Sequence, residues 1–420
     1  MKYIYSLLVT VFTISQTFGY TDPDSTLINR TNKPLSEVEI RLNKIDKERF
    51  NSYRLVDTNR DLSIGITPVN KELSDSLLSE RMAKLNAYSP VEFQSNPIVK
   101  REIEKYLNSP ATGLSVWMSR SKYYFPLFEE ILYQNKLPLE LKILTVLESG
   151  LNPHAESSFG AKGLWQLIFS TAKANGLTMS SYVDERSDPK LSTIGASKYL
   201  IYLYDIYEDW LLALAAYNAG PGNVNKAIRK SGGKWNYWEI RKYLPFQTQD
   251  YVPRFMALNY IFSYAKEHNI GMIKPKFYFE QTDTIKVYRN MPLSFISEEL
   301  DITMDELTYL NPSYILKIIP GTFQKKYSLV LPVDKIGIWI SRKDDLLAKL
   351  DTLESKKKMV YPTLEESNFR TRYTVKSGDY LGKIANKYNV KVSSIKEWNN
   401  LKNSHKLKIG QRLTIYTNHR

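Results

Sequence analysis

The sequence of 420 residues contains no cysteine, and several classes of site are excluded for that reason. Disulfide frameworks, cysteine nucleophiles, thiolate metal sites and a lipid-modified N-terminal cysteine all need a residue that is absent. Histidine is also scarce: four residues are scattered along the chain, and none forms a closely spaced pair. A histidine-based metal site is therefore not expected.

Acidic residues are outnumbered, with 58 Lys and Arg against 44 Asp and Glu and a formal net charge of +14. Such an excess favours an anionic polymer as partner, such as nucleic acid, a membrane surface or an acidic glycan. Hydrophobic residues (43%) and charged residues (24%) are present at levels typical of folded protein. At roughly 100–200 residues per domain, the length allows two to four domains.

Residues 1–19 have the layout of a cleaved export signal. Lys2 precedes a short apolar run from Ile4 to Ile14, and the small residues Thr17 and Gly19 precede the expected cleavage point. The run is too short for a membrane-spanning helix of about 20 residues, and no later stretch is apolar enough for one. We therefore expect an exported protein of the periplasm or cell envelope, which makes an envelope polymer a better partner than nucleic acid.

The rest of the chain divides by pattern. Residues 20–73 are polar with little periodicity, which predicts a loosely ordered lead-in. Residues 74–268 repeat apolar side chains every three to four positions between Gly and Pro turns, which predicts one all-α domain. Residues 276–335 and 372–417 both follow the order strand, helix, helix, strand, an internal repeat typical of duplicated binding modules. Residues 336–371 are highly charged, and we interpret them as a linker.

Glu148 is the first candidate for chemistry. It stands among Leu144, Val146 and Leu147 near the end of a predicted helix, directly before a turn that contains Gly150. A carboxylate in such surroundings suits a general acid, because desolvation favours its protonated form. Taken alone, the pattern fits a surface glutamate at a helix end better than a catalytic acid.

Further motifs change that balance. Gly-Leu-Trp-Gln at 163–166, Ala-Tyr-Asn-Ala-Gly at 216–220 and Tyr-Val at 251–252 follow the Glu148-Ser149 turn in this order. Together they resemble the catalytic domain of the soluble-type lytic transglycosylases, which are bacterial peptidoglycan-cleaving relatives of goose-type lysozyme. Arg-Ser at 120–121 and Tyr-Phe-Pro at 124–126 look like the transglycosylase D branch. The resemblance implies an α+β multidomain protein with an all-α, lysozyme-like catalytic domain.

The resemblance also implies roles for single residues. Glu148 matches the one catalytic acid and base, and Tyr251 matches a tyrosine that orients this acid. The remaining substrate-binding positions that the resemblance implies are Ser149, Gln166, Tyr217 and Asn218. Without it, Trp165 and Tyr217 fit core aromatics equally well, and the Asn-Ala-Gly sequence fits a helix C-cap.

Two positions depart from the family pattern. Gln247 stands where an acidic residue is common, and Phe159 stands where a small residue is usual. We expect both to alter sugar contacts, and neither removes a proposed catalytic group.

The C-terminal module resembles the LysM domain through Tyr-Thr-Val-Lys-Ser-Gly-Asp-Tyr-Leu at 373–381, Trp-Asn at 398–399 and Ile-Gly-Gln at 409–411. The resemblance implies binding of N-acetylglucosamine in glycan chains through two loops. The glycan-binding residues it implies are Gly378, Asp379, Tyr380, Leu381, Asn400 and Leu401. The module at 276–335 looks like a degenerate copy without the Ser-Gly-Asp loop, and both sugar binding and a role as spacer stay open.

The resemblance implies cleavage of the β-1,4 bond between N-acetylmuramic acid and N-acetylglucosamine, leaving a 1,6-anhydro end, without metal or cofactor. The basic charge then fits the peptide carboxylates of peptidoglycan and the anionic lipids of the envelope, with which peripheral association is expected. Hydrolysis in the same cleft is an alternative, and it needs a second carboxylate such as Asp184 or Asp188. A non-catalytic peptidoglycan-binding protein is another alternative, against which the presence of Glu148 counts. Nucleic-acid binding is not expected, because basic and aromatic residues form no clustered stripe.

Overall fold

The computed structural model describes residues 69–157, 159–356, 369–388, 390–399, 401 and 407–417. The expected export signal (1–19), residues 20–68 of the expected lead-in, and Asn400 lie outside the described residues. Within the described ranges, helices predominate and strands are confined to small sheets, so the predicted α+β fold class is confirmed. No helix of these ranges combines the length and the apolar character that crossing a membrane requires.

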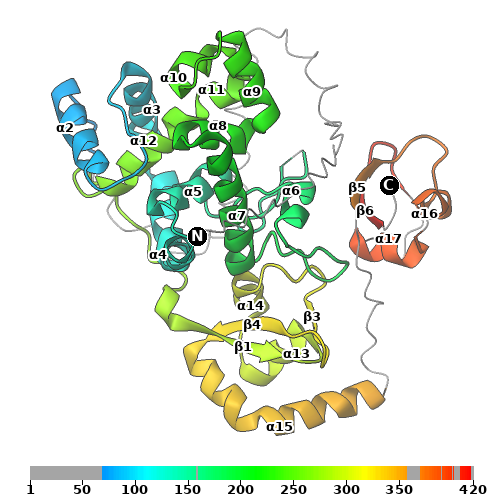
Figure 1. The fold of residues 1–420 in the computed structure, drawn as a ribbon. Helices are drawn as coiled ribbons and strands as arrows, with labels where there is room; N and C mark the ends of the chain where they lie inside the picture. Colours follow the sequence, from blue (N-terminus) through cyan, green and yellow to red (C-terminus); the bar gives the residue numbers. More distant parts are fainter. Residues whose placement is uncertain are drawn as a thin grey trace, which may run out of the picture. The chain divides into compact units, whose positions relative to one another are not determined.

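The first region is helical (Figure 1). Its elements are α2 (Asp75–Asn86), α3 (Pro97–Asn108), α4 (Ala111–Gln134), η2 (Leu139–Ile143), α5 (Leu144–Ser149), α6 (Phe169–Ala174), α7 (Pro189–Tyr207), α8 (Trp210–Ala219), α9 (Pro221–Lys230), α10 (Tyr237–Ile240), η3 (Arg241–Tyr243), α11 (Phe246–Gln249) and α12 (Tyr251–Ser263). Several of these helices start where the sequence supplies a cap: Asn96, Asp188 and Asp209 accept backbone N–H groups from α3, α7 and α8. Pro97 and Pro189 occupy first turns, where their missing N–H costs nothing.

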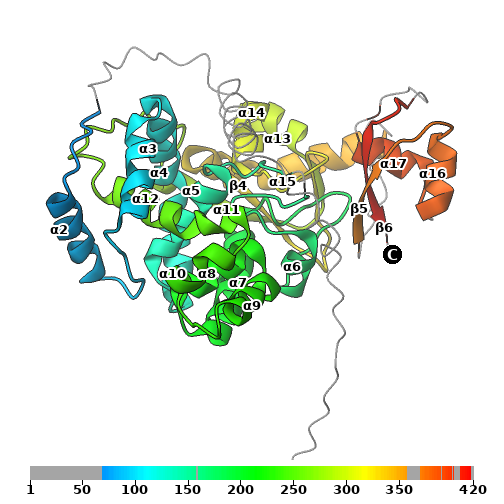
Figure 2. The same cartoon turned by 90° about the horizontal axis from the view of Figure 1, so that it is seen from above.

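The core of this region is built around α8. Residues 211–216 of α8 are all buried, and α8 packs against α7, α9 and α12. Both views place α7, α8 and α9 side by side (Figures 1 and 2). Trp165 lies fully buried in the same core, where its indole Nε1 donates a hydrogen bond to Thr193 Oγ1 at 2.9 Å. The loop that carries Trp165 and Gln166 is thereby fixed to the start of α7.

A second, smaller core follows. Its elements are η4 (Phe279–Gln281), β1 (Thr282–Val287), β2 (Asn290–Pro292), α13 (Leu293–Leu300), α14 (Met304–Leu310), β3 (Ile318–Pro320), β4 (Tyr327–Pro332) and α15 (Val333–Ser355). Strand β1 pairs with β4 antiparallel, Thr282 opposite Pro332, and β2 pairs with β3, Asn290 opposite Pro320.

Helix α15 corrects our interpretation of residues 336–371 as a linker. Its Trp339, Leu346 and Leu350 are buried in the second core, and Arg289 from the β1–β2 turn forms ion pairs with Asp351 (2.6 Å) and Glu354 (2.8 Å). The three apolar side chains are seven and four positions apart and share one helix face, which the surrounding charges conceal in the sequence. This helix therefore belongs to the module, and residues 357–368 of the expected linker lie outside the described residues.

The C-terminal module contains β5 (Phe369–Thr374), α16 (Leu381–Tyr388), α17 (Val392–Trp398) and β6 (Arg412–Thr417). Strands β5 and β6 are antiparallel, with Tyr373 opposite Leu413. Asn399 directly follows α17 and is hydrogen-bonded to both backbone groups of Thr414, donating to its carbonyl at 2.8 Å and accepting from its N–H at 2.6 Å. One amide side chain thus fixes the second helix to the last strand.

Gly163 provides a test of this packing. Its φ is +85°, and a Cβ atom there would lie 1.7 Å from the carbonyl oxygen of Arg186. We expect Gly163→Ala to lower the free energy of unfolding by about 3 kcal/mol, because both the conformation and the space exclude a side chain. Urea unfolding followed by circular dichroism measures this change.

Gly222→Ala in α9 is the matched control. A Cβ atom at Gly222 meets nothing within 4 Å, and the backbone is helical. We expect unchanged or slightly greater stability, by at most about 1 kcal/mol. Equal stabilities of the two variants would contradict the close contact between Gly163 and Arg186.

Candidate active site

Glu148 lies in the last turn of the short helix α5, half-buried. The helix ends at Gly150, which adopts the left-handed conformation (φ 58°) and donates its N–H to the carbonyl of Val146 at 2.9 Å. A Cβ at Gly150 would lie 2.6 Å from Nε1 of Trp117, so glycine is required for space as well as for conformation. The tight turn leaves the carboxylate at the end of a largely buried helix.

Tyr251 is the hydrogen-bond partner of this carboxylate. It is the first residue of α12, is only 5% exposed, and donates its hydroxyl to Glu148 Oε1 at 2.6 Å. Burial, and then the negative charge of Glu148, raise the pKa of Tyr251 well above its ordinary value. The hydroxyl therefore stays protonated and acts as a permanent donor to the carboxylate.

Tyr217, at the end of α8, lies close to the same carboxylate. Burial, and then the charge of Glu148, raise the pKa of Tyr217 well above its ordinary value. Its hydroxyl donates to the backbone carbonyl of Trp165 at 2.7 Å. The Tyr217 hydroxyl thus fixes the loop before Gln166, and the residue as a whole is partly exposed.

Ser149 also contacts this loop. Its side chain is buried, and its hydroxyl lies 2.8 Å from the carbonyl oxygen of Thr145 and 2.9 Å from that of Leu164. The residue next to the candidate acid therefore connects α5 with the loop of residues 155–167. Both of these partners of the Ser149 hydroxyl are backbone carbonyls of the protein.

Gln166 and Asn218 present amide groups. Gln166 adopts a positive φ of 47°, and its Nε2 donates to the carbonyls of Ala155 (3.0 Å) and Gly163 (2.9 Å). Asn218 is exposed, and its Oδ1 accepts a hydrogen bond from Thr248 Oγ1 at 2.8 Å. Each amide is held by one end, and Gln166 Oε1 and Asn218 Nδ2 are groups that can accept from or donate to a polar ligand.

The structure brings four of the predicted motifs together. The hydrogen bonds Glu148–Tyr251, Ser149–Leu164 and Tyr217–Trp165 connect α5, the loop before α6, the end of α8 and the start of α12. The two positions that depart from the family pattern, Phe159 and Gln247, are both exposed.

An ionic network that the sequence reasoning missed fixes the start of α12. Asp250, directly before Tyr251, accepts from Arg241 at 2.7 Å and from Arg101 at 3.3 Å. Arg101 also pairs with Glu102 at 3.1 Å, and this carboxylate, 2% exposed, pairs with Arg254 of α12 at 3.5 Å. The only signal in the sequence was an acidic residue preceding Tyr251, with its cationic partners distant along the chain.

The two aspartates considered for hydrolysis have structural partners. Asp184 is fully buried and is paired with Arg186 at 2.7 Å and with Lys162 at 3.2 Å. Asp188 caps α7 by accepting the N–H of Leu191 at 2.8 Å, and burial raises the pKa of Asp188. A base that activates water must face the substrate, which a fully buried Asp184 does not do.

The first predicted glycan-binding loop of the C-terminal module turns at Gly378 (φ 79°). Asp379 accepts from Tyr373 Oη at 2.5 Å and from the backbone N–H of Lys376 at 2.8 Å, and these bonds hold the pKa of Asp379 below its usual range. Tyr380 is 63% exposed, whereas Leu381 is buried in the module's core. Of the second loop, Leu401 is partly buried.

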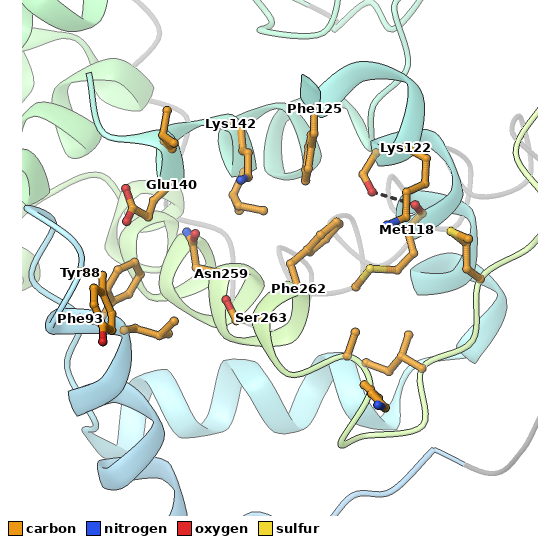
Figure 3. A pocket seen from close by; sticks show the side chains of 18 of the residues that line it. Tyr88, Phe93, Met118, Lys122, Phe125, Glu140, Lys142, Asn259, Phe262 and Ser263 are labelled. Atoms are coloured by element: carbon orange, nitrogen blue, oxygen red, sulfur yellow. Dashed lines mark hydrogen bonds between the residues drawn. The ribbon is translucent and has the colours of Figure 1, made fainter. Parts of the chain in front are cut away.

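A cavity of about 690 Å³ lies between α2, α4, η2 and α12 (Figure 3). Phe125 and Phe262 face each other in it, with ring centroids 5.4 Å apart. Its basic lining residues are Lys84, Lys122, Lys142 and Lys266. Glu148 and Tyr251 are not among the lining residues, so this cavity is separate from the candidate catalytic groups. No cluster of metal-ligating side chains occurs in the ranges that the structure describes.

Three family models match the chain. They are the transglycosylase SLT domain at residues 127–238, the LysM-like domain of the lytic transglycosylase MltD at 281–348, and the LysM domain at 373–415. The second match extends into α15, in agreement with the packing of that helix on the module.

Known proteins also match. The chain is 30% identical over 327 residues to the membrane-bound lytic murein transglycosylase D of Escherichia coli K12, covering 76% of this chain and 69% of that protein. It is 30% identical over 169 residues to the membrane-bound lytic murein transglycosylase F of Cellvibrio japonicus, covering 36% and 33% of the two chains. The 70-kDa soluble lytic transglycosylase of Escherichia coli is 21% identical in sequence and superposes on half of this chain and 34% of its own, with a TM-score of 0.31.

Proposed function

Because the chain belongs to the family of the membrane-bound lytic murein transglycosylase D, we propose that Glu148 is the single catalytic carboxylate of a peptidoglycan lytic transglycosylase. The bond cleaved is the β-1,4 linkage between N-acetylmuramic acid and N-acetylglucosamine. The observation that carries the role of Glu148 is the 2.6 Å hydrogen bond from Tyr251, a permanent donor, to a half-buried carboxylate at a helix end.

One carboxylate is enough for this reaction. Protonated Glu148 gives its proton to the oxygen that leaves C1 of the muramic acid residue, and the C1–O4 bond breaks. The sugar ring then carries oxocarbenium character. Ionised Glu148 takes the proton of the C6 hydroxyl of the same sugar, and O6 forms a bond to C1. The product is a 1,6-anhydro end, and no water is consumed, so no second carboxylate is needed to activate it.

Tyr251 supports both steps by orienting the carboxylate. A hydroxyl that stays protonated donates to Glu148 throughout the cycle, and its bond is strongest when Glu148 is ionised. The ionic network at Asp250 holds the first turn of α12, and therefore the Tyr251 ring, in place. Geometry of this kind matters because small displacements of a catalytic group lower the rate strongly.

The other residues divide into two groups. Gln166 and Asn218 present amide groups that fit the hydroxyls and acetamides of the sugars. Ser149 and Tyr217 position the Gln166 loop through its backbone carbonyls. Both groups act on the same glycan strand, one by contact and one by holding the loop in shape.

The C-terminal LysM module adds glycan binding to the catalytic domain. The net charge of +14 favours a polymer with peptide carboxylates. The relative's name places that protein at a membrane, and this chain, which has no cysteine, is proposed to act in the envelope as an exported protein with peripheral attachment. The second LysM loop carries Asn400, which lies outside the described residues, so its role stays a prediction.

The first test is digestion of purified peptidoglycan sacculi, with mass spectrometry of the released muropeptides. We expect products that end in anhydro-muramic acid, and we expect Glu148→Gln to lower their rate of release at least about a thousandfold, because the proton donor is lost. Glu140→Gln, a partly exposed glutamate in η2, is the matched control and keeps wild-type activity. Reducing ends from the wild type would instead indicate hydrolysis.

Tyr251→Phe tests the orienting hydrogen bond. We expect kcat to fall about ten- to a hundredfold with little change in KM, because the ring stays and only the donor is lost. Tyr260→Phe in the same helix is the control. It removes a hydroxyl that contacts Arg81 and His268, and we expect it to leave kcat unchanged. An unchanged kcat of Tyr251→Phe would contradict the proposed role.

Tyr380→Ala tests the LysM loop. In a Glu148→Gln background, which binds without cutting, we expect about tenfold weaker pelleting with sacculi, because an exposed tyrosine supplies contact area for a sugar. Tyr133→Ala, which removes a tyrosine that is 76% exposed near the end of α4, is expected to pellet as the parent does. Equal loss of binding by both variants would argue against a specific role of the loop.

A further inference from the structure

The LysM-like module of residues 282–355 is hydrogen-bonded to the catalytic domain through a short stretch of β-type pairing. Val183 and Tyr314 form an antiparallel bridge, flanked by two main-chain hydrogen bonds. These run from Asp184 N to Ser313 O at 2.9 Å and from Ile315 N to Tyr182 O at 2.8 Å. Tyr182 and Val183 are buried in the core of the module, although they belong to the catalytic domain in sequence. The contact is therefore part of the module's fold.

A second contact is aromatic. Tyr309 of α14 packs against Tyr123 and Tyr124 of α4, with ring centroids 5.8 and 6.4 Å apart. Leu310, the next residue, is buried in the core of the catalytic domain. Each core thus contains residues of the other region, which favours one fixed arrangement over a flexible tether.

Both modules share one frame, which allows their loops to be compared. Asn311 follows α14 and is hydrogen-bonded to both backbone groups of Val330, at 2.8 and 2.9 Å, as Asn399 is to Thr414 in the C-terminal module. Residues 312–315 therefore correspond to the loop that begins at Asn400. In the LysM-like module this loop pairs with residues 182–184 of the catalytic domain.

In the LysM-like module, the segment that corresponds to the first glycan-binding loop also makes contacts within the protein. Asn290–Pro292 corresponds in sequence to the Gly378–Tyr380 loop, but it forms strand β2, paired with Ile318–Pro320 of β3. Met291, 1% exposed, stands where the C-terminal module has Asp379. Both loops that the LysM resemblance assigns to sugar thus make protein contacts in this module.

The docked segment supports the sugar-binding loop of the active site. Asp184 accepts from Arg186 Nε (2.9 Å) and Nη2 (2.7 Å), and fully buried Arg186 donates from Nη1 to the carbonyl of Gly160 at 2.9 Å. Asp184 also pairs with Lys162 at 3.2 Å, and the Arg186 carbonyl lies against Gly163. Residues 160–163 thus contact the buried Asp184–Arg186 ion pair. The backbone N–H of Asp184 in turn donates to Ser313 of the LysM-like module.

We propose that the LysM-like module is a brace for the active site. It holds the segment Tyr182–Arg186, and through this segment it holds the loop that presents Gln166 to the glycan. The proposal rests on the proposed function, because it assigns Gln166 to the substrate. Loss of the brace is expected to weaken glycan binding in the cleft more than it slows the chemical step, since Glu148 and Tyr251 are held by α5 and α12.

A reversible crosslink tests the brace. The chain has no cysteine, so Val183→Cys with Tyr314→Cys creates one defined pair. Residues opposite each other in a bridge without mutual hydrogen bonds have Cα atoms about 4.5 Å apart, a separation that allows a disulfide. The Tyr314 ring is missing in both forms of this variant, so only the crosslink distinguishes them. In the reduced form we expect KM for soluble uncrosslinked glycan to rise at least about fivefold, with kcat within about twofold of the wild type. We expect oxidation to restore KM.

Ile315→Pro removes the N–H that donates to Tyr182 and is the second variant. We expect the same rise in KM, whereas Phe323→Ala, 89% exposed in the same module, is expected to keep wild-type kinetics. Circular dichroism establishes that each variant is folded.

The outcomes separate this proposal from the proposed function. A reduced double-cysteine variant with wild-type KM, or an oxidised form slower than the reduced one, would overturn the brace. Absence of anhydro products from the wild-type enzyme would instead overturn the proposed reaction, whatever the crosslink does.

Discussion

The hydrogen bond from the Tyr251 hydroxyl to the Glu148 carboxylate is the contact around which the proposed catalytic site is arranged. Glu148 is half-buried at the end of an apolar helix, and without a partner its charge would be costly there. Tyr251 supplies the partner at 2.6 Å. The turn at Gly150, the packing of α5 against α12 and the burial of Tyr251 bring these two side chains together.

The groups proposed to contact the sugar are held in place by other side chains. Ser149 and Tyr217 direct their hydroxyls to backbone carbonyls of the loop before Gln166, and Asp250 fixes the first turn of α12 through Arg241 and Arg101. Asp184 and Arg186 extend this support to the LysM-like module. In our proposal the LysM-like module is part of the catalytic unit, while the C-terminal LysM module retains an exposed loop at Tyr380.

Local pattern was sufficient to predict much of this. The spacing of apolar residues placed Glu148 at a helix end, and the motifs at 163–166 and 216–220 indicated the lysozyme-like domain. Contacts between distant residues could not be predicted: Glu148 and Tyr251 are 103 positions apart, and Val183 meets Tyr314 across two domains.

Two other features, the direction of the Ser149 side chain and the packing of α15, could not be predicted from the sequence. The resemblance assigned Ser149 to the substrate, but nothing in a sequence shows that its hydroxyl faces a backbone carbonyl at Leu164. The charges of α15 likewise masked the face of Trp339 and Leu346, and so we expected a linker there. Side-chain direction and tertiary pairing depend on the folded surroundings, and the role of Ser149 toward the substrate stays a prediction.

The most direct test of the single-carboxylate mechanism is the fate of solvent oxygen. Sacculi digested by the wild-type protein in water enriched in heavy oxygen are analysed by mass spectrometry of the newly formed muramic acid ends. Attack by the C6 hydroxyl predicts ends that are one water lighter than lysozyme products and carry no solvent oxygen. One heavy oxygen at each new end would show that water is the nucleophile and would contradict the account.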